Sequence, residues 1–334
     1  MIQPIFKALA LTIITLTFSS QALAFEQNFY SFSQGTAAND LLTNADNIDT
    51  VLPQSYEFGR NLRLNRVADG GVHQAARDTD TKLIPLVYQQ NFDQNLMTAI
   101  LRIESLQKLL INQLIAEAKT QDYEGWQYDF ENIATIDRDR YSDFVERSYK
   151  AFQDEGLEFS VAIVPRTADF RPGVDFEDYS SAYDLKAIAE NSDYVTLMAY
   201  NDPNSVGPTA SLPYVERVVD YALTKAPASK LSLGVPMYCS KWYVNDGYRF
   251  RNSISQRLTQ EDVDESLFSI EKYNESLESE MYLYVLQSGN IYITWCDGAQ
   301  GLAEKIDVVE ENNLRGISAW SLGQEVPEVW DVLD

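Results

Sequence analysis

Histidine is almost absent from this chain of 334 residues, which contains only His73, in the turn-like stretch Gly-Gly-Val-His. A serine–histidine–aspartate triad, or a metal site made of several histidines, would have to be built around that one side chain. No glycine-rich phosphate loop follows the first expected strand, as a dinucleotide-binding fold would require. We therefore expect neither a metal nor a cofactor.

Basic residues are scarce relative to acidic ones. The chain has 26 lysines and arginines against 50 aspartates and glutamates, which gives a formal net charge of −24. Phosphate binding needs clustered cations, so this balance argues against nucleic acid as a partner.

Long apolar runs are also scarce, and the one candidate lies at the N-terminus. Lys7 precedes the apolar run Ala8–Phe18, and Ala22-Leu23-Ala24 follows it. A short apolar region closed by A-x-A predicts a signal peptide over residues 1–24, with an uncleaved anchor as the alternative. We expect residues 25–334 to be exported to the periplasm or secreted, without stable insertion in a membrane.

Only two cysteines are present, Cys239 and Cys296. An exported protein meets an oxidising environment, in which the two could close a loop of nearly sixty residues. The chain-entropy model values such a loop at roughly 4 kcal/mol. Two buried free thiols are the alternative that the sequence leaves open, and we predict the disulfide.

What the sequence does have is a regular alternation of short β-rich runs and helical runs. Leu106, Leu110, Leu114 and Ala118 fall on one face of a predicted helix over Ser105–Lys119. Other helices are predicted over Asp137–Gln153, Leu212–Lys225 and Leu302–Asn313. Eight strands are predicted, over Asn28–Phe32, Ile48–Leu52, Leu83–Tyr88, Gly125–Phe130, Phe159–Val164, Tyr194–Tyr200, Leu231–Tyr238 and Leu314–Trp320. This count predicts a (β/α)8 TIM barrel, with a doubly wound sheet as the alternative.

Two regions interrupt the alternation. Gly59–Thr81 is polar and indicates a hairpin or a long loop. Residues 239–300 are too long for an ordinary connection and contain the strand-like pair Glu280–Leu286 and Asn290–Trp295. We expect a small insertion there, ahead of the last barrel strand, whose acidic stretch Gln260–Glu280 forms a solvated helical surface.

The segment most informative about chemistry is residues 123–132, Tyr-Glu-Gly-Trp-Gln-Tyr-Asp-Phe-Glu-Asn. In a strand its side chains alternate, so Gln127, Asp129 and Glu131 point into the barrel while the aromatic residues face the covering helices. Glu131 then lies where the strand ends at the active-site face of the barrel. A solvated strand end is the alternative reading.

Asp129 and Glu131 would be close enough to influence each other's ionisation. Two partly desolvated carboxyl groups cannot both ionise freely, so at least one pKa should rise. A carboxyl group that keeps its proton near neutral pH can act as a general acid on a glycosidic oxygen.

These residues resemble a known family. Glu124-Gly125-x-Gln127-x-Asp129-x-Glu131 is similar to the D-G-x-D-x-D-x-E signature of glycoside hydrolase family 18, which includes chitinases and bacterial cell-wall hydrolases. The subgroup of spore-cortex peptidoglycan hydrolases, in which an amide often replaces the middle aspartate, is the most similar. Further segments resemble the family's sixth, seventh and eighth strands in order: Tyr194–Asn201, Leu233–Tyr238 and Gly316–Gly323.

The resemblance implies a role for each matching residue. Glu131 would be the acid/base, Asp129 would orient the substrate's 2-acetamido group, and Tyr200 would hold the acetamido oxygen. Met198 would pack nearby, and Trp320 would support the sugar ring. Ordinary barrel packing is the alternative for Tyr200, Met198 and Trp320. Tyr238 would line the groove, although core packing explains it equally well, as it does Trp242.

Two substitutions depart from the family pattern at residues that would contact or adjoin the substrate. Gln127 replaces an aspartate, which leaves two carboxylates in the stack, and Asn201 stands where chitinases often have aspartate. Both could change the rate or the pH optimum, but neither changes Glu131.

The resemblance therefore predicts a secreted hydrolase of N-acetylglucosamine-containing polysaccharides or oligosaccharides, either peptidoglycan or chitin-type, with substrate-assisted retaining catalysis. A catalytically silent glycan-binding barrel is one alternative. A two-carboxylate glycosidase that uses Asp202 as nucleophile is another.

Overall fold

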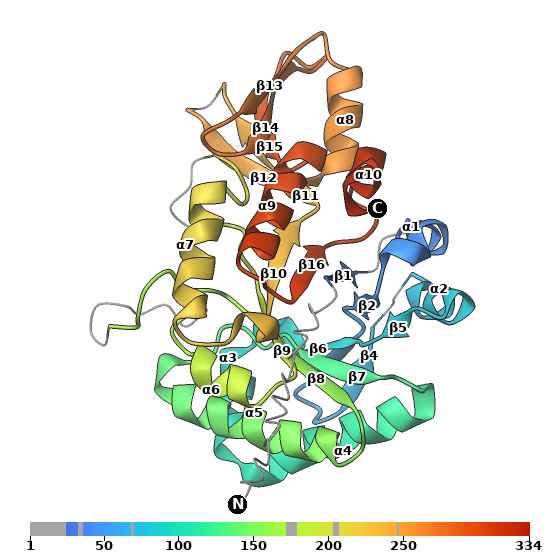
Figure 1. Cartoon of the computed structure of the whole chain (residues 1–334), viewed down its shortest axis with the longest axis vertical. Helices are drawn as coiled ribbons and strands as arrows, with labels where there is room; N and C mark the ends of the chain where they lie inside the picture. Colours follow the sequence, from blue (N-terminus) through green and yellow to red (C-terminus); the bar gives the residue numbers. More distant parts are fainter. Residues whose placement is uncertain (1–24, 33–35, 68–69, 172–178, 203–206, 246) are drawn as a thin grey trace, which may run out of the picture.

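The computed structural model describes residues 25–32, 36–67, 70–171, 179–202, 207–245 and 247–334. Its central element is a barrel of parallel strands, which confirms the predicted (β/α)8 fold (Figure 1). The barrel strands are β1 (Glu26–Ser31), β2 (Thr50–Pro53), β5 (Lys82–Leu83), β6 (Leu86–Gln89), β7 (Gly125–Tyr128), β8 (Glu158–Ile163), β9 (Tyr194–Leu197), β10 (Leu231–Pro236) and β16 (Gly316–Trp320).

The third barrel strand is split into β5 and β6 around Pro85. Proline cannot donate a backbone hydrogen bond, so the ladder is interrupted there. β5 pairs with β2 on one side, and β6 pairs with β7 on the other. The sheet runs without a break from β6 to β5, since β16 pairs with both β1 and β10. Because β5 and β6 are two halves of one strand, the two ends of the sheet meet and the barrel closes.

Helices cover the outside of the barrel, as the sequence predicts. Four predicted helices are present with small shifts at their ends, the largest at the last one, which begins three residues earlier than expected. The helices are α1 (Ala37–Asn44), α2 (Val72–Thr79), α3 (Gln94–Arg102), α4 (Glu104–Gln121), α5 (Arg138–Gln153), α6 (Leu185–Glu190), α7 (Leu212–Leu223), α9 (Ala299–Glu311) and α10 (Trp330–Leu333).

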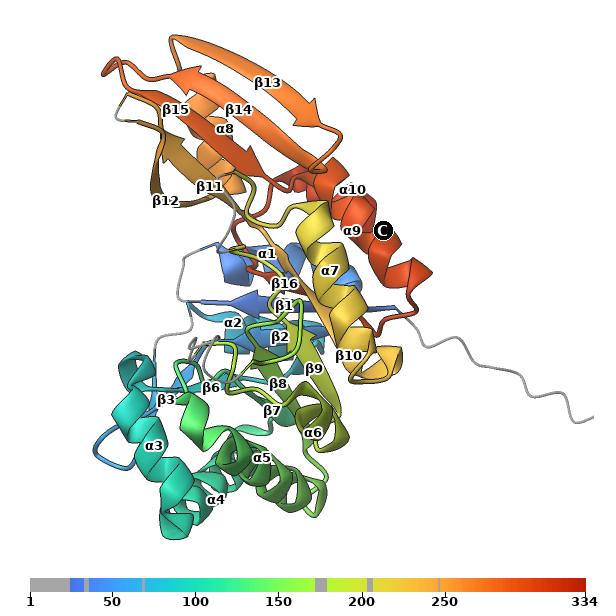
Figure 2. The same cartoon turned by 90° about the vertical axis from the view of Figure 1, so that its left-hand side faces the viewer.

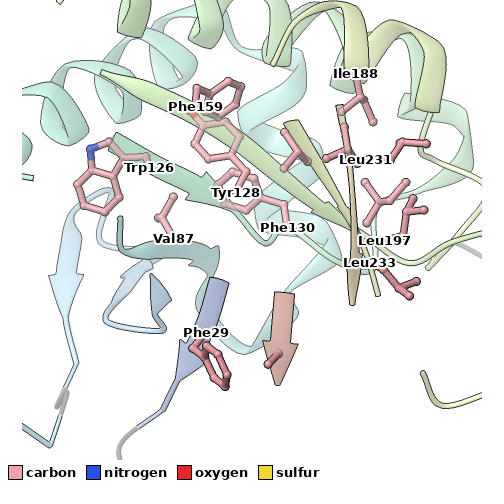
Figure 3. Packing of buried hydrophobic residues seen from close by; sticks show 14 of the residues in the cluster. Phe29, Val87, Trp126, Tyr128, Phe130, Phe159, Ile188, Leu197, Leu231 and Leu233 are labelled. Carbon is pink, nitrogen blue, oxygen red and sulfur yellow. The ribbon is translucent and has the colours of Figure 1, made fainter. Parts of the chain in front are cut away.

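The core of the molecule lies between the strands and these helices. Trp126, Tyr128 and Phe130 alternate outward from β7 and are completely buried. Figure 3 shows them packed with residues from the neighbouring strands. The Trp126 indole donates a hydrogen bond to the carbonyl of Leu114 on α4, at 3.0 Å.

The Gly59–Thr81 region contains more structure than the sequence predicts. The hairpin is present as β3 (Tyr56–Phe58) and β4 (Leu64–Arg66), and helix α2 follows it. His73 therefore lies at the start of helix α2, where the sequence suggested a turn-like stretch. It is buried, with Ser55 Oγ 2.7 Å from its Nε2 and Tyr123 Oη 3.0 Å from its Nδ1.

A second, antiparallel sheet lies between β10 and β16 in the sequence (Figure 2). Its strands, in spatial order, are β12 (Arg249–Ser255), β11 (Tyr238–Tyr243), β15 (Ile291–Cys296), β14 (Ser279–Val285) and β13 (Phe268–Asn274), and helix α8 (Gln256–Asp264) packs on one face. The prediction of a helical surface over Gln260–Glu280 is thus wrong beyond α8. Residues 268–274 form an edge strand, stabilised by pairing with β14 that sequence periodicity alone does not show.

A disulfide joins two strands at the base of the second sheet, and an ion pair and hydrogen bonds connect this base to helix α9. Cys239 and Cys296, opposite each other on β11 and β15, form a disulfide with their Cα atoms 4.3 Å apart. Next to it, Lys305 of α9 lies 3.2 Å from the Asp297 carboxylate, and both side chains are buried. Glu280 accepts hydrogen bonds from the backbone N–H groups of Gly298 and Gly301 at the start of α9.

The expected signal peptide over residues 1–24 lies outside the described residues. Within the part of the chain that the structure describes, no helix combines the length and apolar character needed to cross a membrane.

We expect the protein to contain no free thiol when it is prepared under oxidising conditions. Alkylation followed by mass spectrometry should leave Cys239 and Cys296 unmodified until a reductant is added. The Cys239→Ser/Cys296→Ser variant should lose about 2–4 kcal/mol of unfolding free energy, because the closed loop no longer restricts the unfolded chain. Denaturant unfolding measures this, and two alkylated thiols in the unreduced protein would contradict the disulfide.

Candidate active site

The site is built on the end of β7, where the chain alternates between two buried environments. Trp126, Tyr128 and Phe130 point into the helix layer, which directs Gln127 and Asp129 into the barrel. Regular pairing ends at Tyr128, two residues earlier than predicted. Asp129 and Glu131 follow at the carboxyl end of the barrel, where the chain leaves the sheet.

Gln127 is completely buried, and all of its polar groups are engaged inside the barrel. Tyr30 donates to its carbonyl oxygen at 2.6 Å, and its amide nitrogen contacts the hydroxyls of Ser160 at 2.9 Å and Thr196 at 3.4 Å. An amide suits this position because it can donate and accept at once. These contacts place Gln127 beneath the carboxylates, as a support for the site.

Asp129 and Glu131 form a desolvated carboxyl pair. Burial raises the pKa of Asp129 well above its usual range, the neighbouring Glu131 raises it further, and a hydrogen bond from Gln54 opposes this. Burial also raises the pKa of Glu131 to about 7. Among the described residues, Asp129 Oδ1 is buried without a hydrogen-bond partner.

Residues from a neighbouring strand and from nearby loops hold the backbone around Glu131. The Gln89 side chain donates to the carbonyl of Glu131, and the Tyr183 hydroxyl donates to the carbonyl of Phe130 at 2.8 Å. Asn132 has a positive φ of 52°, which asparagine tolerates better than most residues, and its amide donates to the Phe92 carbonyl. Glu131 is thus presented by a backbone fixed on both sides.

The far end of this loop is fixed by Asp137, which is completely buried at the start of α5. Arg102 of α3 contacts both of its carboxylate oxygens, at 2.9 and 3.1 Å, and Arg140 contacts one of them at 3.0 Å. A two-point arginine–carboxylate contact restricts orientation more than a single hydrogen bond does. It fixes the point at which the loop from Glu131 enters the helix layer.

Tyr200 and Asn201, which follow β9, lie close to Tyr238, the first residue of β11. The rings of Tyr200 and Tyr238 meet edge to face with centroids 6.1 Å apart, and the Tyr238 hydroxyl donates to Asn201 Oδ1 at 2.8 Å. Burial raises the pKa of Tyr200 well above its usual value, with the charges of Asp129 and Glu131 among the lesser causes, so its hydroxyl keeps its proton at neutral pH. Tyr200 therefore lies in the same electrostatic environment as the carboxyl pair.

Trp320 ends the last barrel strand and is half-buried. Its ring stacks on Phe32, with centroids 5.9 Å apart and planes 10° apart, and it contacts Tyr30. Tyr30 in turn reaches Gln127 beneath the carboxyl pair. The partly exposed ring of Trp320 is thus connected, through Tyr30 and Gln127, to the site around Asp129 and Glu131.

The remaining predicted residues lie at different distances from this cluster. Met198 is half-buried just beyond β9, whereas Glu124 is at the opposite end of β7 and accepts from the backbone N–H of Leu83. Asp202 is half-buried beside Asn201. Within the described ranges, no group of three or more His, Cys, Asp or Glu side chains could hold a metal ion.

Sequence reasoning did not find the residues that support the site from other strands. Tyr30, Gln54 and Tyr183 are remote from Glu131 in the sequence, and no local motif marks them. Tyr30 is on a predicted strand with its side chain inward, which is the only signal the sequence carries. Asp137 heads a predicted helix, where an acidic residue is too common to single out.

Comparison with known proteins shows one family over most of the chain. The model of the family described as "Glycosyl hydrolases family 18" matches residues 74–325. The cortical fragment-lytic enzyme of Bacillus subtilis (strain 168) is 29% identical over 268 residues, which are 78% of this chain and 61% of that protein. The chain therefore spans less than two thirds of the length of this relative.

Solved structures agree on the fold. The spore cortex-lytic enzyme SleL of Bacillus megaterium QM B1551 superimposes with a TM-score of 0.83 at 24% identity, covering 92% of this chain and 73% of that one. A chitinase from Chromobacterium violaceum ATCC 12472 gives 0.80 at 22% identity, covering 91% and 96%. At these identities the likeness shows the barrel and its inserted sheet.

We expect Glu131 to titrate near pH 7 in the folded protein, because burial raises its pKa from the ordinary value of 4.5 to about 7. Carboxyl-¹³C NMR, with Glu131→Gln to assign the signal, measures this. Because the folded state binds the proton more tightly than the unfolded state, the free energy of unfolding should fall as the pH rises from about 4.5 to 7. Glu131→Gln should weaken that dependence without removing it, because burial also raises the pKa of Asp129. Titration of Glu131 near pH 4.5 would contradict the buried pair.

Proposed function

The chain belongs to glycosyl hydrolases family 18 and is a glycosidase related to spore cortex-lytic enzymes and chitinases, and on this premise we propose that it hydrolyses N-acetylglucosamine-containing glycans by substrate-assisted retaining catalysis. The observation that carries the proposal is the desolvated pair of Asp129 and Glu131, with the Glu131 pKa raised to about 7. A carboxyl group with this pKa can both donate and accept a proton near neutral pH.

In the first step, Glu131 donates its proton to the glycosidic oxygen and the bond to the anomeric carbon breaks. The substrate's own acetamido oxygen attacks that carbon and forms a cyclic oxazolinium ion. In the second step, Glu131 removes a proton from water, the water oxygen opens the ring at the anomeric carbon, and the product retains its configuration. No enzyme nucleophile is needed.

Asp129 and Tyr200 act on the acetamido group in this mechanism. Asp129 Oδ1, buried and free of partners among the described residues, is the acceptor for the acetamido N–H. The Tyr200 hydroxyl, which keeps its proton, donates to the acetamido oxygen. Both contacts hold the oxygen toward the anomeric carbon, and reactivity rises steeply when the reacting atoms are held in place.

The contacts of the other matching residues favour supporting roles. Trp320 offers its partly exposed ring as the floor of the sugar site. Asn201, fixed by Tyr238, borders the acetamido region without adding a negative charge. Gln127 holds the cluster from below through Tyr30, and we assign it positioning in place of the substrate contact expected from the sequence.

Peptidoglycan and chitin-type oligosaccharides both contain the required acetamido group. The names of the related proteins include cortical fragment-lytic enzymes and chitinases, so both polymers belong in the test. Export, inferred from residues 1–24, would bring the enzyme to such substrates outside the cytoplasm.

Trp320→Ala should raise KM and lower kcat/KM by about tenfold or more, because loss of a stacking ring removes contacts to the sugar face. Its melting temperature should fall only slightly, since the ring is at the rim of the core. Steady-state kinetics on chitooligosaccharides together with thermal unfolding separate the two effects. A large drop in melting temperature with unchanged KM would assign Trp320 to packing.

Glu131→Gln should lower turnover of an unactivated substrate by about 10²–10⁴-fold with little change in binding, because the amide cannot deliver a proton. Glu124→Gln is the matched control, since Glu124 is exposed at the other end of the same strand. Asp129→Asn should also be damaging, and the double variant should be less damaging than the product of the two effects. A thiazoline analogue of N-acetylglucosamine should inhibit the unmodified enzyme, since it mimics the cyclic ion.

Comparing N-acetylglucosamine and glucose aryl glycosides tests the alternatives. Equal activity on the glucose compound would contradict substrate assistance and favour a two-carboxylate mechanism through Asp202. Binding without hydrolysis would instead indicate a silent glycan-binding barrel.

A further inference from the structure

Residues 321–326, which we call the exit loop, carry the chain away from the last barrel strand directly after Trp320. The loop turns at Gly323, whose φ of 92° is positive. A Cβ at Gly323 would lie 2.6 Å from Thr36 Oγ1, just before α1, so only glycine fits this turn. The exit loop therefore lies tightly against the barrel within three residues of the Trp320 ring.

A buried carboxylate holds the exit loop from inside. Glu325 is completely buried, and its Oε2 accepts from the backbone N–H of Gly323 at 2.7 Å. The Gln324 side chain donates to the Ser321 hydroxyl at 2.7 Å, next to Trp320. These two hydrogen bonds close the exit loop on itself between Trp320 and Glu325.

The other carboxylate oxygen of Glu325 is bound by a residue from the second sheet. Arg257, near the start of α8, places its Nη2 3.1 Å from Glu325 Oε1, and its Nε donates to the Glu325 carbonyl at 2.6 Å. The Arg257 backbone N–H donates to the Gln324 carbonyl at 3.2 Å. The preceding Gln256 side chain accepts from the Val326 N–H at 3.1 Å. Two consecutive residues of α8 thus contact three consecutive residues of the exit loop.

The same arginine connects α8 to the barrel. Its Nη2 lies 2.9 Å from the carboxylate of Asp40 on α1, so Arg257 is held between two acidic side chains. Figure 1 shows α8 above α10 and α1, between the second sheet and the barrel. Arg257 therefore has a fixed position from which to hold Glu325.

Stability alone explains this ion pair poorly. Burial raises the pKa of Glu325 to about 7, and the charge of Arg257 and the Gly323 N–H only partly oppose this. Keeping the carboxylate ionised there costs free energy, and apolar residues often replace a buried ion pair without loss of stability. A contact at two points, to the carboxylate and to the carbonyl of Glu325, does restrict orientation. What it orients is the exit loop.

We propose that Arg257 and Glu325 are positioning residues for substrate binding, which hold the exit loop so that the ring of Trp320 lies under the sugar. Helix α8 thereby contributes to the sugar site without contacting the substrate. This inference rests on the proposed function, because it concerns the ring that we assign to the floor of the sugar site.

The first test is kinetic. Arg257→Gln and Glu325→Gln should each raise KM on chitooligosaccharides by up to about tenfold with kcat nearly unchanged, because the ring can lose no more than its own contacts. In a Trp320→Ala background, either change should alter KM by less than about twofold, since the ring that they position is gone. Arg315→Gln is the matched control, because Arg315 lies at the other end of the same strand, 2.6 Å from Glu26. It should leave KM unchanged.

Melting temperatures verify that the variants fold. Glu325→Gln keeps the side-chain volume and removes the buried charge, so it serves as the test if Arg257→Gln does not fold.

The second test needs no substrate. Protein labelled with 5-fluorotryptophan gives one ¹⁹F NMR signal for each indole, and Trp320→Phe assigns the signal of Trp320. That signal should shift or broaden in Arg257→Gln and in Glu325→Gln, because the exit loop loses a contact. It should stay in place in Arg315→Gln. Measurement near pH 8, above the Glu325 pKa of about 7, keeps the carboxylate mostly ionised.

An unchanged Trp320 signal would overturn the proposal. So would an unchanged KM in both variants, or KM effects that simply multiply with that of Trp320→Ala. A protein inactive on every acetamido substrate would instead contradict the proposed function, and the ¹⁹F signal would still decide whether Arg257 and Glu325 position the ring.

Discussion

Burial of β7 on both of its sides is the constraint on which the rest of the site depends. Trp126, Tyr128 and Phe130 have to face the helix layer, so the alternate side chains have nowhere to go except the barrel interior. Two carboxyl groups placed there lose hydration, and both acquire raised pKa values. The hydrophobic packing of one face of a strand therefore sets the acid–base chemistry on the other.

Desolvated carboxyl groups destabilise the folded state unless the surroundings hold them, and several remote elements contribute to this. Gln54 donates to Asp129, and Gln127 fills the space below with an amide whose hydrogen bonds are all satisfied. The backbone of Glu131 is fixed by Gln89 and by the loop that ends at Asp137. These contacts keep Asp129 and Glu131 in place without neutralising them. The charged side chains among these contacts, Arg102 and Arg140, bind Asp137 and not the carboxyl pair.

The second sheet relates to the barrel in a different way. Its base is fixed by the disulfide and by the buried pair of Asp297 and Lys305, whereas its face opposite α8 has no covering layer in the described structure. The second sheet thus joins the barrel at one end, where β11 follows β10 and β15 leads into α9.

Local pattern in the sequence determined the barrel, its main helices and the carboxyl pair, because alternation along one strand and periodicity along one helix are short-range properties. It did not determine the split at Pro85, the helix that contains His73 or the edge strand from Phe268, each of which is stabilised by partners distant in the chain. Tyr30, Gln54 and Tyr183 join the site only when the barrel closes. Strand register likewise aligns apolar side chains across the second sheet, since no local pattern brings together residues of five separate strands: Ile270, Leu283, Ile293, Trp242 and Phe250.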